Sequence, residues 1–233
     1  MTRAYRPEPP QLLPTTVADG SAPGVYYRID GELVPVLRIW LDGSVPVFFD
    51  HHVVLWKEPA LAIGIKGNSA LKRMIAGVQL FLTEARGPGQ VAFSRHGTGH
   101  MFPLHLRPGS AVEVREHQYL AATGNLEYEG MPNMLFGSTG FFVDRFAATH
   151  SEGVVWLHGY GNVFEKVLGP GEEIDVEPGS WIYRDESVRM DAQVYGLRTG
   201  LLGGTGNLVF NRFTGPGRVG IQSMYMDTPT GST

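Results

Sequence analysis

The stretch VQLFLTEARGPGQVAFS, residues Val78–Ser94, occurs in similar form twice more along the chain. The other copies are FVDRFAATHSEGVVWL, at Phe142–Leu157, and LVFNRFTGPGRVGIQ, at Leu208–Gln222. Each copy has an apolar run, a turn closed by glycine, and a second run rich in β-branched and aromatic residues, as strands do. An interval of 64 residues separates each closing glycine from the next, at Gly89, Gly153 and Gly217. The sequence therefore predicts a triplicated β unit built around a hairpin.

Other signals extend the same unit over most of the chain. The turn Pro108-Gly109 follows the first copy and Pro170-Gly171 follows the second, at an interval of 62 residues. The segment FFDHHVVLW, which starts at Phe48, resembles the later segments VREHQYLAA and VEPGSWIY in its polar turn and flanking strands. We therefore expect one repeat-built domain rather than separate domains.

The composition favours an all-β fold. The 233 residues include 31 Gly and 16 Pro among mostly short apolar runs, which indicates many turns and few helices. We expect a single domain over residues 25–227, a flexible Pro-rich tail over 1–24 and a flexible C-terminal end over 228–233.

Two local features are predicted inside this domain. Asp42-Gly43 has the residue types of a two-residue hairpin turn between strands at Leu33–Leu41 and Val45–Phe49. One short helix is expected at Asn68–Gly77, with Leu71, Met74 and Ile75 spaced to form an apolar face.

Charge and cysteine usage remove several classes of function. The 19 basic and 23 acidic residues leave a net charge of −4 without a basic block, so binding to nucleic acid is not favoured. There is no cysteine, which excludes disulfides and thiolate metal sites. The N-terminal residues lack a secretory pattern, and no run has the roughly 20 apolar residues of a membrane span. We expect a cytoplasmic protein that is not transmembrane.

Several motifs together resemble one protein family. They are HHVVLWKEP, FLTEARGPGQVAFS, VREHQYLAATGNLEYE, FGSTGFF and LLGGTGNLVFNRFTGPGRVGIQ, and the resemblance runs from about Val25 to Met226. The chain is similar to the altered-inheritance-of-mitochondria family, long described as a domain of unknown function. The resemblance implies a fold like that of the tryptophan RNA-binding attenuation protein, an internally repeated β-sandwich of the double-stranded β-helix kind. It also implies assembly into homo-oligomers, and it transfers no catalytic residue or cofactor.

Histidines suggest a metal site. The spacing of His100 and His105 would place them on opposite faces of a strand, and no His-x-His motif occurs. A site assembled across repeats from His51, His117 and Glu116 stays open, because the two histidines lie in similar repeat positions. The alternative interpretation is that these histidines are surface or hydrogen-bonded residues.

No catalytic signature is present, since the chain has no G-x-S-x-G, H-E-x-x-H or Walker motif. The first hypothesis is a non-enzymatic oligomeric β scaffold or binding protein, with no cofactor and an unidentified protein or small-ligand partner. The alternatives are a cupin-like protein that binds a metal or small ligand, with or without enzymatic activity, and a protein that binds single-stranded RNA.

Overall fold

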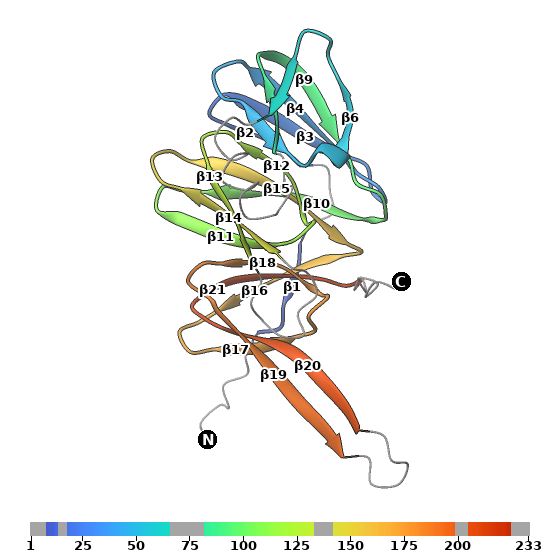
Figure 1. Ribbon diagram of the computed structural model, residues 1–233, viewed down its shortest axis with the longest axis vertical. Coiled ribbons are helices and arrows are strands. Elements are labelled where there is room, and N and C mark those ends of the chain that lie inside the picture. The colour runs from blue at the N-terminus through green and yellow to red at the C-terminus, as the bar shows by residue number, and fades with distance from the viewer. Residues whose placement is uncertain (1–7, 14–17, 66–81, 133–141, 199–204, 225–233) are drawn as a thin grey trace.

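The regular secondary structure of the described residues is almost entirely β. The computed structural model describes residues 8–13, 18–65, 82–132, 142–198 and 205–224, which form 21 strands and the 3-10 turn η1 (His51–Val53). Figure 1 shows the strands stacked as sheets along one elongated body. The predicted all-β, sandwich-like fold is confirmed. Among the described residues, no helix has the length and apolarity needed to cross a bilayer.

Three strands lead the chain, and the remaining eighteen form three successive groups of six, which we call the first, second and third sets. The leading strands are β1 (Gln11–Leu12), β2 (Ala18–Ala22) and β3 (Val25–Asp30). The first set is β4 (Val36–Asp42), β5 (Val47–Phe49), β6 (Val54–Lys57), β7 (Ala62–Ile65), β8 (Thr83–Arg86) and β9 (Pro88–Phe93). The second set is β10 (Gly99–Leu106), β11 (Ser110–Arg115), β12 (Tyr119–Thr123), β13 (Glu127–Pro132), β14 (Phe142–Ala148) and β15 (Gly153–Tyr160). The third set is β16 (Val163–Leu168), β17 (Glu173–Val176), β18 (Trp181–Asp185), β19 (Arg189–Arg198), β20 (Thr205–Thr214) and β21 (Gly217–Gln222).

The same pairing pattern occurs within each set. The sixth strand lies between the first and third strands of its set, as β9 lies between β4 and β6. The fifth strand lies between the second and fourth, as β8 lies between β5 and β7. β15 and β14 have the corresponding neighbours in the second set, and β21 and β20 have them in the third. All these pairs are antiparallel.

Consecutive sets are joined edge to edge. β12 of the second set pairs with β5 of the first, and β18 of the third set pairs with β11 of the second. Each junction produces a run of six strands, in the orders β10-β15-β12-β5-β8-β7 and β16-β21-β18-β11-β14-β13. Every such sheet is therefore shared between two sets.

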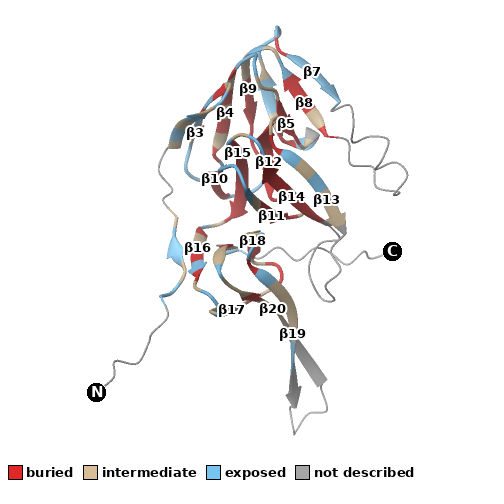
Figure 2. Ribbon diagram, turned by 90° about the vertical axis from the view of Figure 1, so that its left-hand side faces the viewer, coloured by how far each residue is buried: buried red, intermediate tan, exposed pale blue. Residues whose placement is uncertain are grey.

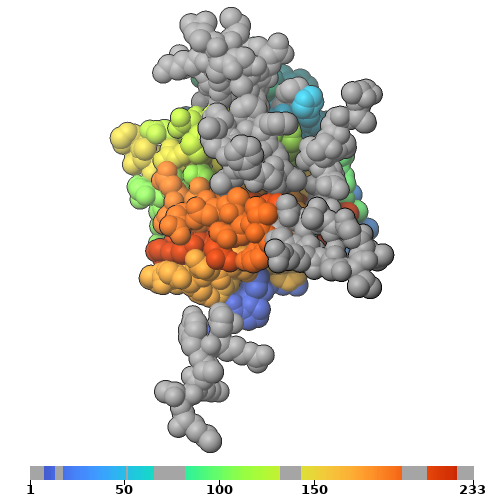
Figure 3. Space-filling model, turned by 60° about the horizontal axis from the view of Figure 1, so that its bottom comes forward, coloured from blue at the N-terminus to red at the C-terminus, as the bar shows by residue number. Residues whose placement is uncertain are grey.

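Among the described strands, two groups of three at the ends of the molecule are not joined in this way. β6 is the last strand of the sheet β2-β3-β4-β9-β6, and β17 is the first strand of the sheet β17-β20-β19. Figure 1 shows the first set at the top of the molecule and the third set at the bottom. Figure 3 shows the bottom end, where the third set appears in amber to red beside the blue residues of β1.

The core lies between the layers and is deepest in the second set. Along β3 buried and exposed residues alternate, with Val25, Tyr27 and Ile29 inside, because only one face of this strand is covered. β15 is buried at every position, since it is central in its sheet and packed on both faces. Figure 2 shows the buried residues in red, concentrated around β12 and β15.

The predicted hairpin is wrong in all three copies of the motif. The strand before the closing glycine and the strand after it pair with different neighbours, as β8 does with β5 and β7 while β9 pairs with β4 and β6. The glycine thus marks a corner at which the chain passes from one sheet to another. Asp42-Gly43 likewise closes no hairpin, because β4 pairs with β3 and β9, and β5 pairs with β8 and β12. Gly43 does take the positive φ expected of it, at 96°.

Ordered strands begin earlier than the expected boundary at residue 25. Within the segment assigned to a tail, β1 pairs with β16, and all five residues of β2 pair with β3. The sequence of β2, ADGSA, has no apolar alternation, because this edge strand is held mainly through its backbone. The helix expected at Asn68–Gly77, the start of the tail at 1–7 and the end at 228–233 lie outside the described residues.

Candidate functional site

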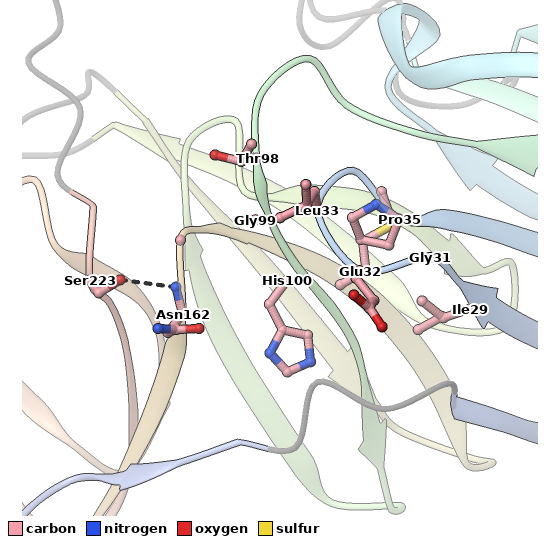
Figure 4. Close-up of a pocket in the computed structure, with 12 residues that line it drawn as sticks. Ile29, Gly31, Glu32, Leu33, Pro35, Thr98, Gly99, His100, Asn162 and Ser223 are labelled. Atoms are coloured by element: carbon pink, nitrogen blue, oxygen red, sulfur yellow. Dashed lines mark hydrogen bonds between the residues drawn. The ribbon is translucent and has the colours of Figure 1, made fainter.

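A cavity of about 270 Å³ lies where the leading strands meet the second and third sets. Its wall is made by the loop between β3 and β4, the start of β10 and the turn after β15 (Figure 4). Polar groups on this wall come from Glu32, Thr98, Asn162 and Ser223. Ser223 accepts a hydrogen bond at its Oγ from the backbone N–H of Asn162, at 2.9 Å. This link fixes one side of the opening.

His100 is the most distinctive side chain of this cavity. It follows Gly99 at the start of β10 and is only 8% exposed, yet its Nδ1 atom has no hydrogen-bond partner among the described residues. Burial lowers the pKa of His100, so the imidazole is neutral at physiological pH. The same residue lines a second cavity of about 400 Å³, together with Glu165, Tyr183 and Arg218. A neutral imidazole with a free ring nitrogen can bind a small polar molecule.

A second histidine lies behind the first. His158 of β15 is fully buried, and neither of its ring nitrogens has a hydrogen-bond partner in the described part of the chain. The backbone of β10 approaches it closely because Gly99 has no side chain: a Cβ there would lie 2.7 Å from Nε2 of His158. Burial lowers the pKa of His158 to about 4, helped by the nearby charges of Arg95 and the histidines His100 and His96. His158 is therefore a neutral core residue at pH 7.

A buried arginine connects the second and third sets close to these histidines. Arg115, at the end of β11, donates from Nη1 to the carbonyl oxygen of Gly179 at 2.5 Å. Gln222 donates to the same oxygen at 2.9 Å and accepts from the backbone N–H of Tyr160 at 3.0 Å. Burial lowers the pKa of Arg115 to about 10, which still leaves the guanidinium charged at neutral pH. These contacts tie the end of β11 to the third set.

The residues proposed for a metal site are only partly described. Glu116 and His117 lie side by side in the turn before β12, with 3.6 Å between Oε1 and Nε2. His51 opens the corresponding turn of the first set, η1, and its side chain lies outside the described residues. Within the described part of the chain, no three His, Cys, Asp or Glu side chains gather as metal ligands would. A metal site that includes His51 stays a prediction.

The two histidines of β10 differ in exposure. His100 is buried and His105 is exposed, and both line the cavity of about 400 Å³. Nε2 of His105 lies 3.0 Å from the hydroxyl of Tyr27. Sequence reasoning missed His158, although an interval of 64 residues separates it from Ser94 and from Gln222. Ser94 directly follows β9 and Gln222 ends β21, and both are buried polar residues. The 64-residue interval was the signal in the sequence that could have identified His158.

Comparison with known proteins agrees with the architecture. A crystal structure of a protein from Streptococcus pyogenes is 21% identical and covers 86% of this chain and 94% of its own, with a TM-score of 0.67. At this identity the likeness shows the fold alone. No curated protein matches the chain. The family described as mitochondrial biogenesis AIM24 matches residues 27–224, which confirms the resemblance found in the sequence. The chain therefore belongs to the mitochondrial biogenesis AIM24 family.

Proposed function

We propose that this protein is a non-enzymatic cytoplasmic β scaffold, made of three copies of one folded module, that works by associating with further copies of itself. The observation that carries the proposal is the pair of incomplete sheets at its ends. Both internal junctions join the third strand of one set to the second strand of the set before it. β6 is a third strand and β17 is a second strand, and neither has this neighbour in the described structure.

The side chains of β6 support this proposal. Trp56 lies opposite Ala92 in the sheet. Ala121 and Tyr183 occupy the same place in the second and third sets, because their partners, Trp156 and Gly220, follow Ala92 at intervals of 64 residues. Ala121 and Tyr183 are fully buried, whereas Trp56 is 46% exposed and its neighbour Leu55 is 52% exposed. A partner on β6 would cover apolar surface that the other sets keep out of water.

Light scattering over a range of protein concentrations tests the proposal. We expect a mass above the 25.5 kDa of one chain at micromolar concentration, with partial dissociation on dilution. A strict monomer across that range would contradict self-association as the basis of function.

Binding of a small polar ligand beside His100 is the second candidate function. It is favoured by the Nδ1 atom of a nine-tenths buried imidazole on the cavity wall, which has no hydrogen-bond partner in the described part of the chain. Native mass spectrometry of gently purified protein should then show a bound small molecule, and a His100→Phe variant should lose it. Wild-type protein that carries no such molecule, and no metal by elemental analysis, would remove this candidate.

A further inference from the structure

We infer that copies of this chain associate head to tail, with β6 of one copy paired antiparallel to β17 of the next in the register of the internal junctions. This inference rests on the proposed self-association and specifies its interface. A β6·β17 pair would give the order β4-β9-β6-β17-β20-β19. As in the two complete six-stranded runs, the first, sixth and third strands of one set would be followed by the second, fifth and fourth strands of another. The end sheets would then be as complete as the internal ones.

The internal junctions fix which residues would face each other. At the junction of the second and third sets, Tyr183 is opposite Val114 and Arg184 is opposite Glu113. At the junction of the first and second sets, Ala121 is opposite Phe49 in the same register. Trp56 and Lys57 correspond to Tyr183 and Arg184 through their partners in the sixth strand.

The residues of β17 that would face β6 are identified by how the second strand pairs with the fifth strand in each set. Asp175 lies opposite Arg212 of β20, as Glu113 lies opposite Arg145 of β14. The transferred register therefore places Trp56 opposite Val176 and Lys57 opposite Asp175.

The charges at these positions are complementary. In the internal junction Arg184 forms an ion pair with Glu113, whose other neighbour across the sheet is Arg145. In the third set Arg212 binds the carboxylate of Asp175 with two hydrogen bonds, at 2.7 and 2.8 Å. A lysine arriving from the other side would place Asp175 between two cations, as Glu113 already is. The pairing thus extends an arrangement that the chain uses within itself.

The backbone of β17 also fits a partner. The N–H of Gly215 donates to the carbonyl oxygen of Glu172 at 2.9 Å, which marks a hydrogen-bonded pair of the β17–β20 ladder. Because hydrogen-bonded and non-bonded pairs alternate in an antiparallel ladder, Glu173 and Asp175 direct their backbone groups toward the open side. Within the described residues, no strand pairs with β17 on this side.

One difference weakens the proposed junction relative to the internal ones. Each internal junction ends in a backbone hydrogen bond, from Gly124 to Pro46 at 2.7 Å and from Glu186 to Ala111 at 3.0 Å. The corresponding donor position after β6 is Pro59, which has no N–H. We therefore expect a reversible association rather than a permanent one.

The geometry of association follows from the use of two different edges. A contact between unlike surfaces leaves one β6 and one β17 free in every dimer, so it continues until a ring closes or a filament grows. An isologous dimer would use the same edge twice and would stop at two chains.

Trp56→Glu is the first test, because it places a carboxylate at the centre of the proposed junction while altering a half-exposed side chain. Sedimentation analysis should show association weakened about tenfold or more, with an unchanged circular dichroism spectrum. The matched control is Ile63→Glu on β7, an exposed apolar residue on a fourth strand, and among the described strands the fourth strand is at an open sheet edge in every set. If Trp56→Glu assembles as wild type and Ile63→Glu do, the β6–β17 pairing is contradicted but self-association is not. If the wild-type protein is monomeric, the β6–β17 pairing and the proposed self-association are both contradicted.

A charge pair provides the second, independent test. Lys57→Glu would set two carboxylates opposite each other and should also weaken association, whereas adding Asp175→Asn removes the repulsion and should restore part of it. Failure of the double variant to recover would contradict the register.

Mixing tests the head-to-tail geometry. Trp56→Glu chains keep an intact β17 edge, so in excess they should cap wild-type assemblies and lower their mean mass. An unchanged mass on mixing would overturn the head-to-tail arrangement.

Discussion

Ser94, His158 and Gln222 occupy one position in the three sets, and their backbone role is constant. Each donates its N–H to the turn before the third strand: to Val53 at 2.8 Å, to Gln118 at 2.8 Å and to Ser180 at 2.7 Å, respectively. Their side chains differ in what they bind. Ser94 and Gln222 donate to backbone carbonyl groups, whereas the imidazole of His158 has no partner among the described residues. His158 is therefore the member of this series that responds to pH.

We expect the stability of the protein to fall between about pH 6.5 and pH 4 because of His158. Its pKa is lowered to about 4 in the folded chain, while an unfolded histidine titrates near 6.5. Across that window the unfolded chain binds a proton that the folded chain does not. The free energy of unfolding should thus drop by about 1.4 kcal/mol per pH unit, and by roughly 3 kcal/mol in all.

Urea denaturation at several pH values measures this slope. His158→Gln, which copies the residue of the third set, should flatten the slope above pH 5, apart from a smaller share from His100, whose pKa is also lowered by burial. An equal slope in both proteins would assign the effect to other groups.

At the scale of elements, the strand, glycine corner and next strand were predictable, but their pairing was not. The 64-residue interval located the corners at Gly89 and Gly217, where φ is 142° and 138°. A short turn between two strands usually signals a hairpin, and sequence periodicity reports which side of a strand is buried rather than which strand lies beside it. β8 and β9 pair with earlier strands of their own set instead of with each other. Only tertiary packing decides between this arrangement and a hairpin.

The corner glycine of the third set should not tolerate a side chain. At Gly217 the backbone has a φ of 138°, and a Cβ would lie 2.7 Å from Cγ2 of Val188. Gly217→Ala should lower the free energy of unfolding by about 1–3 kcal/mol, as strain and steric overlap add.

The control is Gly64→Ala on β7, where a Cβ would meet nothing within 4 Å. Chemical denaturation should find the control close to wild type. A Gly217→Ala protein as stable as Gly64→Ala would show that the corner can rearrange.

At the scale of the whole molecule, the all-β fold and the family were predictable, whereas the pocket around His100 was not. Its walls come from the β3–β4 loop, β10 and the turn after β15, which are far apart in sequence and meet only when the sheets stack. The proposed metal residues illustrate the same limit, because His51 and His117 lie in corresponding turns of successive sets and such a correspondence does not define the distance between two side chains.

Self-association should make thermal stability depend on protein concentration. Because assembly binds folded chains only, the midpoint of thermal unfolding should rise as wild-type protein is concentrated. The Trp56→Glu variant should show a much smaller rise, since its β6 edge is blocked. Differential scanning fluorimetry over a wide concentration range makes the comparison, and parallel curves for the two proteins would contradict it.

The sharing of each sheet between consecutive sets has a consequence during synthesis. β5 emerges from the ribosome well before β12, the strand that will flank it, and β11 likewise precedes β18. A nascent chain therefore displays an unfinished sheet until translation has supplied the following set. A ribosome that stalls between sets leaves that edge exposed to other nascent chains, and chaperone demand should be highest at those two points of elongation.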